Sequence, residues 1–296
     1  MSATGPSALQ APLPRSAAWP ARARRALRRA PLTAKFGLLV VLLYVAVALF
    51  APLLAPFAES EVVGQAYLPW GGEHLLGTDH LGRDMLSRML YGARNTIGIA
   101  LATTALAFLA GGALGLLAAV VGGWVDQLLS RLVDLLMAVP HLIFTLVLLT
   151  IFGSSVLNLI LIIAALDATR VFRLARATGR AVAVLEFVEA ARLQGERLGW
   201  IMAREVLPNV TAPLVAEFGL RFCFVFLTIS ALAFLGLGLQ PPTADWGSMV
   251  RENATLITYG DVTPLLPAGA IALLAVAVNF LVDWLLHLAS GLKDER

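Results

Sequence analysis

Six runs of apolar residues, each about as long as a bilayer crossing, constrain the fold of this chain more than any other feature. A helix rises about 1.5 Å per residue, so about 20 apolar residues cross the ~30 Å hydrocarbon core of a membrane. The chain is 59% hydrophobic and 14% charged, whereas a soluble domain carries roughly 25% charged residues. The sequence therefore predicts an all-α, polytopic transmembrane helical bundle with about six spans. The candidate spans are 36–57, 94–121, 132–152, 156–172, 209–236 and 264–288.

Positive charges are distributed unevenly around these spans. Seven Lys and Arg residues lie in 1–35 and six in 173–208, whereas the predicted outer segments hold three, with a fourth at a span edge. Because cytoplasmic loops are enriched in Lys and Arg, both termini and 173–208 are predicted to be cytoplasmic. The chain then divides into a basic arm 1–35, expected to be disordered, a first span with an outer loop (36–93), a transmembrane core (94–288) and a short tail (289–296).

The chain lacks the residues of a nucleotide-binding loop. Such a loop ends in Gly-Lys-Ser/Thr, but neither of the two lysines, Lys35 and Lys293, follows a glycine. We expect no catalytic residue, and the single Cys223 is predicted to be a small buried hydrophobe. His74 and His80 share the outer loop with acidic residues, which is compatible with a metal site or with a solvated loop, and no metal is expected there. The basic arm is attributed to membrane orientation, and no nucleic-acid partner is expected.

Six ionisable residues lie within spans or at their edges, where an unpaired charge is costly. Asp167 and Arg170 are spaced i, i+3, and Glu217 and Arg221 are spaced i, i+4, so each pair can neutralise itself along one helix face. Paired structural charges are one interpretation; an ion relay and a contact with substrate or partner are the others. A relay through Asp167, Arg170 and Asp283 would make the chain a self-contained ion-coupled secondary transporter. The six residues are Asp134, Asp167, Arg170, Glu217, Arg221 and Asp283.

The predicted cytoplasmic loop has a helical composition. Ala190 and Ala191 are small enough to let a partner approach closely, and Gly195 permits a sharp turn. Pro208 is tolerated in the first turn of the following span. Such a segment can be a helix that docks into a groove on a soluble partner, or a solvated linker helix.

Several motifs in order along the chain resemble one family of transporters. Glu189-Ala190-Ala191, Gly195 and Leu207-Pro208 resemble the EAA loop of binding-protein-dependent ATP-binding-cassette (ABC) importers. Over roughly residues 36–285 the chain resembles the dipeptide, oligopeptide and nickel permeases of that family. The motifs that carry this second resemblance are Leu76-Gly77-Thr78-Asp79, Gly82-Arg83-Asp84-Met85-Leu86-Ser87-Arg88, Tyr91-Gly92-Ala93-Arg94, Gly122-Gly123-Trp124-Val125-Asp126, Arg131-Leu132-Val133-Asp134, Phe234-Leu235-Gly236-Leu237-Gly238-Leu239-Gln240-Pro241-Pro242 and Trp246-Gly247.

The resemblance implies a type I ABC importer permease fold and a place in the bacterial cytoplasmic (inner) membrane. Such a chain forms half of a translocation pore, together with a homologous second permease, for peptides or a related small solute. Two cytoplasmic ATPase subunits would dock on the EAA loops and bind the ATP and Mg, so this chain itself would hold no cofactor. An extracytoplasmic solute-binding protein would deliver the substrate, which could be a peptide, nickel, an opine or a sugar.

One motif has no single expected role, and two positions depart from the family pattern. The outer-loop motif, made of Gly77, Thr78, Asp79, Gly82, Arg83 and Asp84, could contact the binding protein or gate the pore, or its glycines could shape a turn. Glu205 stands where the family pattern favours an apolar residue. The last span reads Val282-Asp283-Trp284 where this branch usually has a Gly-Asp step.

Overall fold

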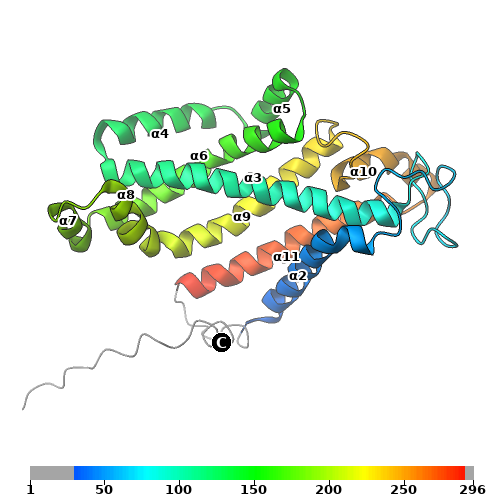
Figure 1. Ribbon diagram of the computed structural model, residues 1–296, viewed down its shortest axis with the longest axis horizontal. Coiled ribbons are helices and arrows are strands. Elements are labelled where there is room, and N and C mark those ends of the chain that lie inside the picture. The colour runs from blue at the N-terminus through cyan, green and yellow to red at the C-terminus, as the bar shows by residue number, and fades with distance from the viewer. Residues whose placement is uncertain (1–29, 291–296) are drawn as a thin grey trace, which may run out of the picture.

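The computed structural model describes residues 30–290, with side chains up to 288, as an elongated bundle of helices (Figure 1). Most of the predicted arm 1–35 and of the tail 289–296 therefore lies outside the described residues. Between 30 and 290 the extended backbone forms only isolated bridges. The helices are α2 (Leu32–Leu54), α3 (Met85–Val121), α4 (Gly123–Met137), α5 (His141–Phe152), α6 (Val156–Ala183), α7 (Glu186–Leu193), α8 (Leu198–Trp200), the π-helix η1 (Ile201–Val206), α9 (Leu207–Phe234), α10 (Trp246–Asn253), the 3-10 helix η2 (Ala254–Tyr259) and α11 (Leu265–Ser290).

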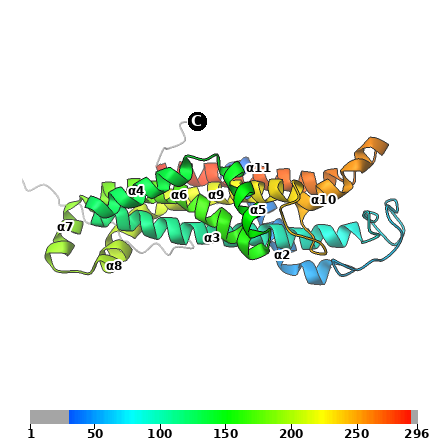
Figure 2. The same ribbon diagram turned by 90° about the horizontal axis from the view of Figure 1, so that it is seen from above.

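The long helices run roughly along one axis, and the short elements gather at its two ends. In both views α7 and α8 lie at one end of the bundle, and α10 lies at the other end beside segment 55–84 (Figures 1 and 2). The longest helix, α3, has 37 residues, which at 1.5 Å per residue is about 55 Å. Because the hydrocarbon core is only ~30 Å thick, α3 must project beyond it.

Four helices of the described chain are long and apolar enough to cross a membrane, and the count becomes five when α4 and α5 are taken as one broken span. The four are α2, α3, the run Leu198–Phe234 and α11. α6 has 28 residues, enough to cross, but Asp167, Arg170 and later arginines lower its apolarity. The prediction of an all-α membrane bundle is confirmed, and about six spans is an approximate count.

The predicted third span, 132–152, is broken into two helices. α4 and α5 meet at an angle of 85°, with Pro140 as the residue before α5. Proline restricts the residue before it and cannot continue a helical hydrogen-bond pattern, so a break at this point follows from the sequence. Residues 122–131, left between the second and third predicted spans, are not a loop, because α4 already begins at Gly123.

Several other helix boundaries differ from the predicted spans. α3 begins at Met85 rather than at 94, because Asp84 caps it by accepting a 2.8 Å hydrogen bond from the Ser87 N–H. α6 continues to Ala183, so the first third of the predicted loop 173–208 is helix. The loop that remains between the long helices is short and is formed mainly by α7 and α8.

Close contact between α3 and α6 forms the middle of the bundle. A Cβ at Gly111 would collide with the Ala168 carbonyl oxygen, and a Cβ at Gly115 would meet the Phe172 carbonyl oxygen at 2.6 Å. Glycine at these positions lets the two backbones approach, as in other membrane helix pairs. Gly112, one residue from Gly111, faces open space instead.

Trp246 anchors the short helix α10 to the long helices. Its side chain is buried, its indole N–H donates to the Met89 carbonyl oxygen at 3.0 Å, and its ring packs edge-on against Tyr44 and Phe226. Gly92 leaves room for the indole ring. These contacts tie α10 to α2, α3 and α9.

Candidate functional site

The predicted EAA loop forms a helix-turn unit that protrudes from one end of the bundle. Glu189, Ala190 and Ala191 lie in α7, and Gly195 follows that helix with φ +80°. The Glu196 N–H bonds to the Ala191 carbonyl at 3.2 Å, and the Gly195 N–H bonds to the Arg192 carbonyl at 3.0 Å. This is the Schellman arrangement, which requires a left-handed residue where glycine stands. Gly195 therefore ends α7 and turns the chain, as its sequence position predicted.

One face of α7 packs against the long helices. Val188 is fully buried and Ala191 is 6% exposed, and both belong to one apolar cluster. The guanidinium of Arg192 donates a 2.7 Å hydrogen bond to the Val120 carbonyl oxygen at the end of α3. This bond joins the loop to the second predicted span, a contact that the sequence did not indicate. The other members of the cluster are Leu116, Val120, Ala175, Ile201, Val206 and Val210.

The opposite face of the same unit is exposed and carries large apolar side chains. Glu189, Ala190 and Gly195 are exposed, and a Cβ at Gly195 would meet no atom within 4 Å. Leu193 is 83% exposed, which is unfavourable for an end of the bundle that meets only water. The exposed apolar residues around α7 are Val184, Leu185, Phe187, Leu193 and Leu198.

Helix α9 begins at Leu207 with Pro208 in its first turn, as the sequence suggested, but the helical path begins earlier. The helical run starts at Leu198 and continues to Phe234, and the π-helix η1 lies immediately before Pro208. A proline removes one helical N–H and its ring crowds the carbonyl four residues earlier. The wider π-turn, a form often found at functional sites, accommodates this residue without ending the helix. Leu207 and Pro208 are both exposed.

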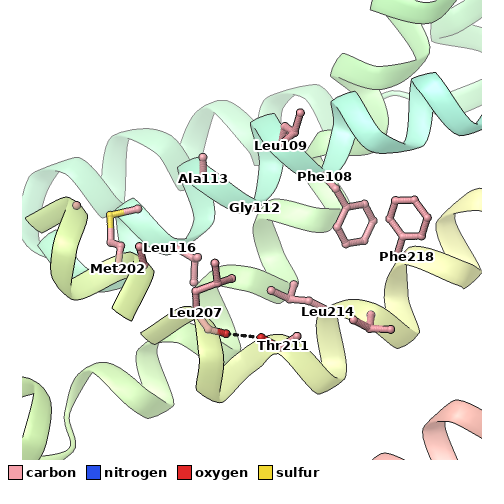
Figure 3. Close-up of a pocket in the computed structure, with 13 residues that line it drawn as sticks. Phe108, Leu109, Gly112, Ala113, Leu116, Met202, Leu207, Thr211, Leu214 and Phe218 are labelled. Carbon is pink, nitrogen blue, oxygen red and sulfur yellow. Dashed lines mark hydrogen bonds between the residues drawn. The ribbon is translucent and has the colours of Figure 1, made fainter. Parts of the chain in front are cut away.

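An apolar groove of about 550 Å³ separates α3 from α9 beside η1 (Figure 3). Phe108 and Phe218 meet across its far end, with ring centroids 5.1 Å apart. The Thr211 hydroxyl, the one side-chain hydroxyl in its wall, donates to the Leu207 carbonyl oxygen at 2.7 Å. The groove is therefore suited to apolar packing. The remaining wall residues are Leu109, Gly112, Ala113, Leu116, Gly199, Met202, Ala203, Leu214 and Val215.

The two predicted charge pairs form one network. Arg221 Nε lies 2.7 Å from Glu217 Oε1, and Arg170 Nη1 lies 3.6 Å from Asp167 Oδ1. Arg221 Nη1 also lies 3.7 Å from Asp167 Oδ1, which joins the pairs across α6 and α9. His141, which sequence reasoning left out, adds α5 through a 3.3 Å contact between its Nε2 and Asp167 Oδ2.

Asp134 and Asp283 do not belong to this network. Asp134 is exposed on α4, and Asp283 is exposed on α11, where it lines a cavity with Pro31 and Trp284. The three residues of the ion-relay hypothesis are thus divided between two places. A different pair was missed: the buried carboxylate of Asp126 on α4 accepts hydrogen bonds from the partly exposed guanidinium of Arg176 on α6.

The outer-loop motif is largely buried in segment 55–84. Thr78, Asp79, Arg83 and Asp84 are each at most 3% exposed. A Cβ at Gly77 or Gly82 would collide with the carbonyl oxygens of Leu68 and Gly64, respectively. The turn-forming interpretation of the glycines therefore has direct structural support.

Asp79 is the centre of an ion network at this end of the molecule. It accepts hydrogen bonds from the Leu81 N–H at 2.9 Å and from Arg83 Nε at 2.7 Å, and Arg88 Nε lies 3.2 Å away. Both arginines also lie 3.4 Å from Glu252 at the end of α10. Asp79, His80 and Glu252 are close enough to hold a metal ion. The two arginines already neutralise both carboxylates, so the geometry fits an ion-pair network that joins α3 to α10.

Asp245 provides a second bond between the same two helices. It accepts 2.9 Å hydrogen bonds from the Thr96 hydroxyl on α3 and from the Ser248 N–H, which it caps at the start of α10. Burial raises the pKa of Asp245 above its ordinary value, and these hydrogen bonds oppose that rise. Neither Asp245 nor Thr96 was singled out from the sequence, because an aspartate before a tryptophan carries little signal by itself.

Comparison with known proteins relates the chain to membrane components of transport systems. Residues 111–290 match the family described as "Binding-protein-dependent transport system inner membrane component". Residues 19–69 match the "N-terminal TM domain of oligopeptide transport permease C". Together the two matches cover most of the chain, including the EAA loop and the charge network.

Several relatives are similar over most of their length. The dipeptide transport system permease protein DppC of Alkalihalophilus pseudofirmus is 34% identical over 260 residues, covering 87% of this chain and 83% of that protein. The di/tripeptide transport system permease protein DppC of Pseudomonas aeruginosa is 37% identical over 265 residues, covering 87% and 85%. The glutathione transport system permease protein GsiD of Pectobacterium atrosepticum is 33% identical over 258 residues, covering 86% and 83%. The chain belongs to the family of binding-protein-dependent transport system inner membrane components and is a multi-pass permease subunit of an ABC importer.

Proposed function

We propose that this chain forms half of a peptide-conducting pore whose movement is driven through α7. The observation that carries this proposal is the division of α7 into a buried face and an exposed apolar face at one end of the bundle. The peptide assignment is supported by the names of the relatives, which transport dipeptides, tripeptides and glutathione. A homologous permease would supply the other half of the pore.

Two ATPase subunits would dock on the exposed faces of α7 in the two permeases. The exposed Leu193 and Phe187 offer apolar contact, and the small Ala190 allows a partner's surface to approach. ATP and Mg would be bound by those subunits, in keeping with the missing Gly-Lys-Ser/Thr motif. The α7 end would then face the cytoplasm, together with both termini.

The solute-binding protein would meet the opposite end, at segment 55–84 and α10. This end has exposed apolar side chains around a rigid ion network, as expected of a surface that a partner covers. Asp79 and its neighbours would hold the surface in shape rather than touch the partner. The exposed side chains there include Tyr67, Trp70, Leu75 and Leu81.

Alternating access provides the mechanism. When the ATPases close, α7 would move, and its contacts with α3, α6 and η1 would carry that movement into the long helices. Because η1 continues directly into α9, rotation at α8 and η1 would change the apolar groove between α3 and α9. The pore between the two permeases would then change the side to which it opens.

Co-purification tests the proposal most directly. The full-length chain, expressed with its partner subunits and extracted in mild detergent, should bring down two ATPase subunits and one homologous permease. Deletion of 189–195 should abolish ATPase recovery and peptide uptake while the chain still inserts in the membrane. Normal ATPase recovery and normal uptake after that deletion would exclude α7 as the coupling element.

Gly195 allows a finer test of the same idea. A residue other than glycine pays about 1–2 kcal/mol in the left-handed region, and asparagine pays less than most. We expect Gly195→Asn to lower uptake least, Gly195→Ala to lower it more, and Gly195→Val to lower it most. Because open space surrounds the position, a steric explanation predicts no such order with residue type and would leave Gly195→Ala unaffected.

A further inference from the structure

A small polar cavity lies beside the break between α4 and α5, partway along α6. Its volume is about 200 Å³, well above the space that a single water needs. Its polar wall is formed by His141 at the start of α5 and by Thr169 and Arg170 on α6. The apolar wall consists of Leu136, Met137, Val139, Pro140 and Leu166.

Helix α5 meets this cavity at its first residue, His141. The first helical hydrogen bond runs from the Phe144 N–H to the Pro140 carbonyl, so the N–H groups of the three residues before Phe144 lack helical acceptors. Among the described side chains, none caps this helix. Uncapped N–H groups and the positive end of the helix dipole favour an anion. Broken membrane helices direct such ends at anionic groups of their substrates.

Arg170 adds a guanidinium to the same wall. Its side chain is 38% exposed, and its contact with Asp167 at 3.6 Å is longer than a hydrogen bond. Arg221, in contrast, is 11% exposed and lies 2.7 Å from Glu217. Arg170 therefore retains donors for a ligand, and a guanidinium matches the two oxygens of a carboxylate.

Asp167 contacts both elements that carry the donors, through Arg170 on α6 and through His141 at the start of α5. Its carboxylate is 2% exposed, with one oxygen 3.3 Å from His141 and the other facing Arg170 and Arg221. The negative charges of Asp167 and Glu217 balance the positive charges of Arg170 and Arg221. The network is therefore neutral before any ligand binds. A carboxylate bound at Arg170 would leave Arg221 shared between Asp167 and Glu217, and the partial positive charge at the start of α5 would offset part of the added negative charge.

We propose that this cavity binds the terminal carboxylate of the transported peptide, with Arg170 and the backbone N–H at the start of α5 as its donors. Asp167 and His141 are positioning residues. The inference rests on the proposed peptide function and adds to it, because the permease itself would select peptides with a free C-terminal carboxylate. Selection would thus occur in the membrane as well as in the binding protein.

Direct contact can be measured by solid-state NMR on the complete importer in nanodiscs. The probe is alanyl-alanine carrying ¹³C at its carboxyl group, and the importer carries ¹⁵N in its arginine side chains. Dipolar dephasing between carboxyl and guanidinium is expected in the unaltered importer, absent in Arg170→Gln, and retained in Arg173→Gln. Arg173 is the matched control because it is exposed on the same helix and does not line the cavity. Dephasing that is absent from the unaltered importer, or that survives in Arg170→Gln, overturns the proposal.

Uptake by proteoliposomes gives an independent readout with alanyl-alanine and its C-terminal amide. Loss of a charged hydrogen bond corresponds to about tenfold to hundredfold, so Arg170→Gln should lower uptake of the acid by that factor and change uptake of the amide little. Arg170→Lys should be intermediate, and Asp167→Asn should weaken the dephasing and lower uptake of the acid more than uptake of the amide. The binding protein is a separate, unaltered chain, so any change in the acid-to-amide ratio arises in the permease.

The outcomes separate this inference from the proposed function. If Arg170→Gln lowers uptake of both peptides by the same factor, or of neither, the carboxylate site is wrong and the peptide function stands. If the unaltered importer takes up neither peptide, the peptide function is wrong and the carboxylate site falls with it.

Discussion

The Arg192 guanidinium donates a 2.7 Å hydrogen bond to the Val120 carbonyl oxygen, and this bond fixes α7 to the last turn of α3. A positive side chain at the C-terminal end of a helix also interacts favourably with the helix dipole. Together with the buried Val188, the bond gives α7 a polar and an apolar attachment to the same group of long helices. A force applied to α7 therefore reaches α3 directly.

Arg192→Gln should uncouple ATP hydrolysis from transport. A charged hydrogen bond contributes about 1.5–3 kcal/mol, so we expect uptake per ATP hydrolysed to fall by about tenfold with the amount of protein in the membrane unchanged. Proteoliposome uptake and ATPase rates, measured together, check this. Arg131→Gln removes an exposed arginine of α4 and should behave like the unaltered importer. Equal uptake per ATP in both variants would mean that the bond to α3 transmits nothing.

The packing of α3 on α6 provides a stability test with an adjacent control. Gly111→Ala places a methyl group against the backbone of Ala168, whereas Gly112→Ala meets open space. Overpacking costs about 1–3 kcal/mol, so Gly111→Ala should lower the apparent unfolding temperature of the purified importer by several degrees. Gly112→Ala should leave it within about a degree. Thermal unfolding followed by tryptophan fluorescence distinguishes the two, and equal midpoints would contradict the close contact.

These glycines illustrate what the sequence can and cannot specify. Small residues in an apolar run allow close helix packing, and Gly111 and Gly115 lie where α3 packs on α6, but spacing alone does not show that Gly112 faces away. The length of the apolar runs likewise predicts the membrane bundle. α4 was missed because Asp126 and Arg131 make its sequence resemble a loop, and the partner of Asp126 is Arg176, fifty residues away.

The charged residues show the same limit. Spacing along one helix predicted the pairing of Glu217 with Arg221, which the structure confirms. The link from Asp167 to Arg221 depends on how α6 packs against α9, and the link to His141 depends on the break at Pro140. A single sequence contains no record of which helices are neighbours, so a network across three helices becomes visible only in the fold.

The binding-protein contact can be mapped by site-specific crosslinking from the segment around the outer-loop motif. Asp79 of that motif is fully buried, whereas Leu75 is 67% exposed. We expect a photoreactive residue at position 75 to crosslink to the solute-binding protein and one at position 79 to disturb folding. Mass spectrometry of the products identifies the partner. Crosslinks from position 79 alone, in a normally folded importer, would contradict the buried ion network.

The stability of the α10 end should change with pH because of Asp245. Burial raises its folded-state pKa above the ordinary value of 3.8, so the folded state holds this proton more tightly than the unfolded state does. Stability then falls as pH rises from 3.8 through the raised folded-state pKa, and this loss is complete above it. Asparagine can still cap α10 and bond to Thr96 without a charge. Asp245→Asn should therefore be relatively more stable at pH 8 than at pH 4, with the unaltered chain as reference. Unfolding midpoints of both proteins across that range measure the difference, and a difference that does not change with pH would mean that Asp245 keeps an ordinary pKa.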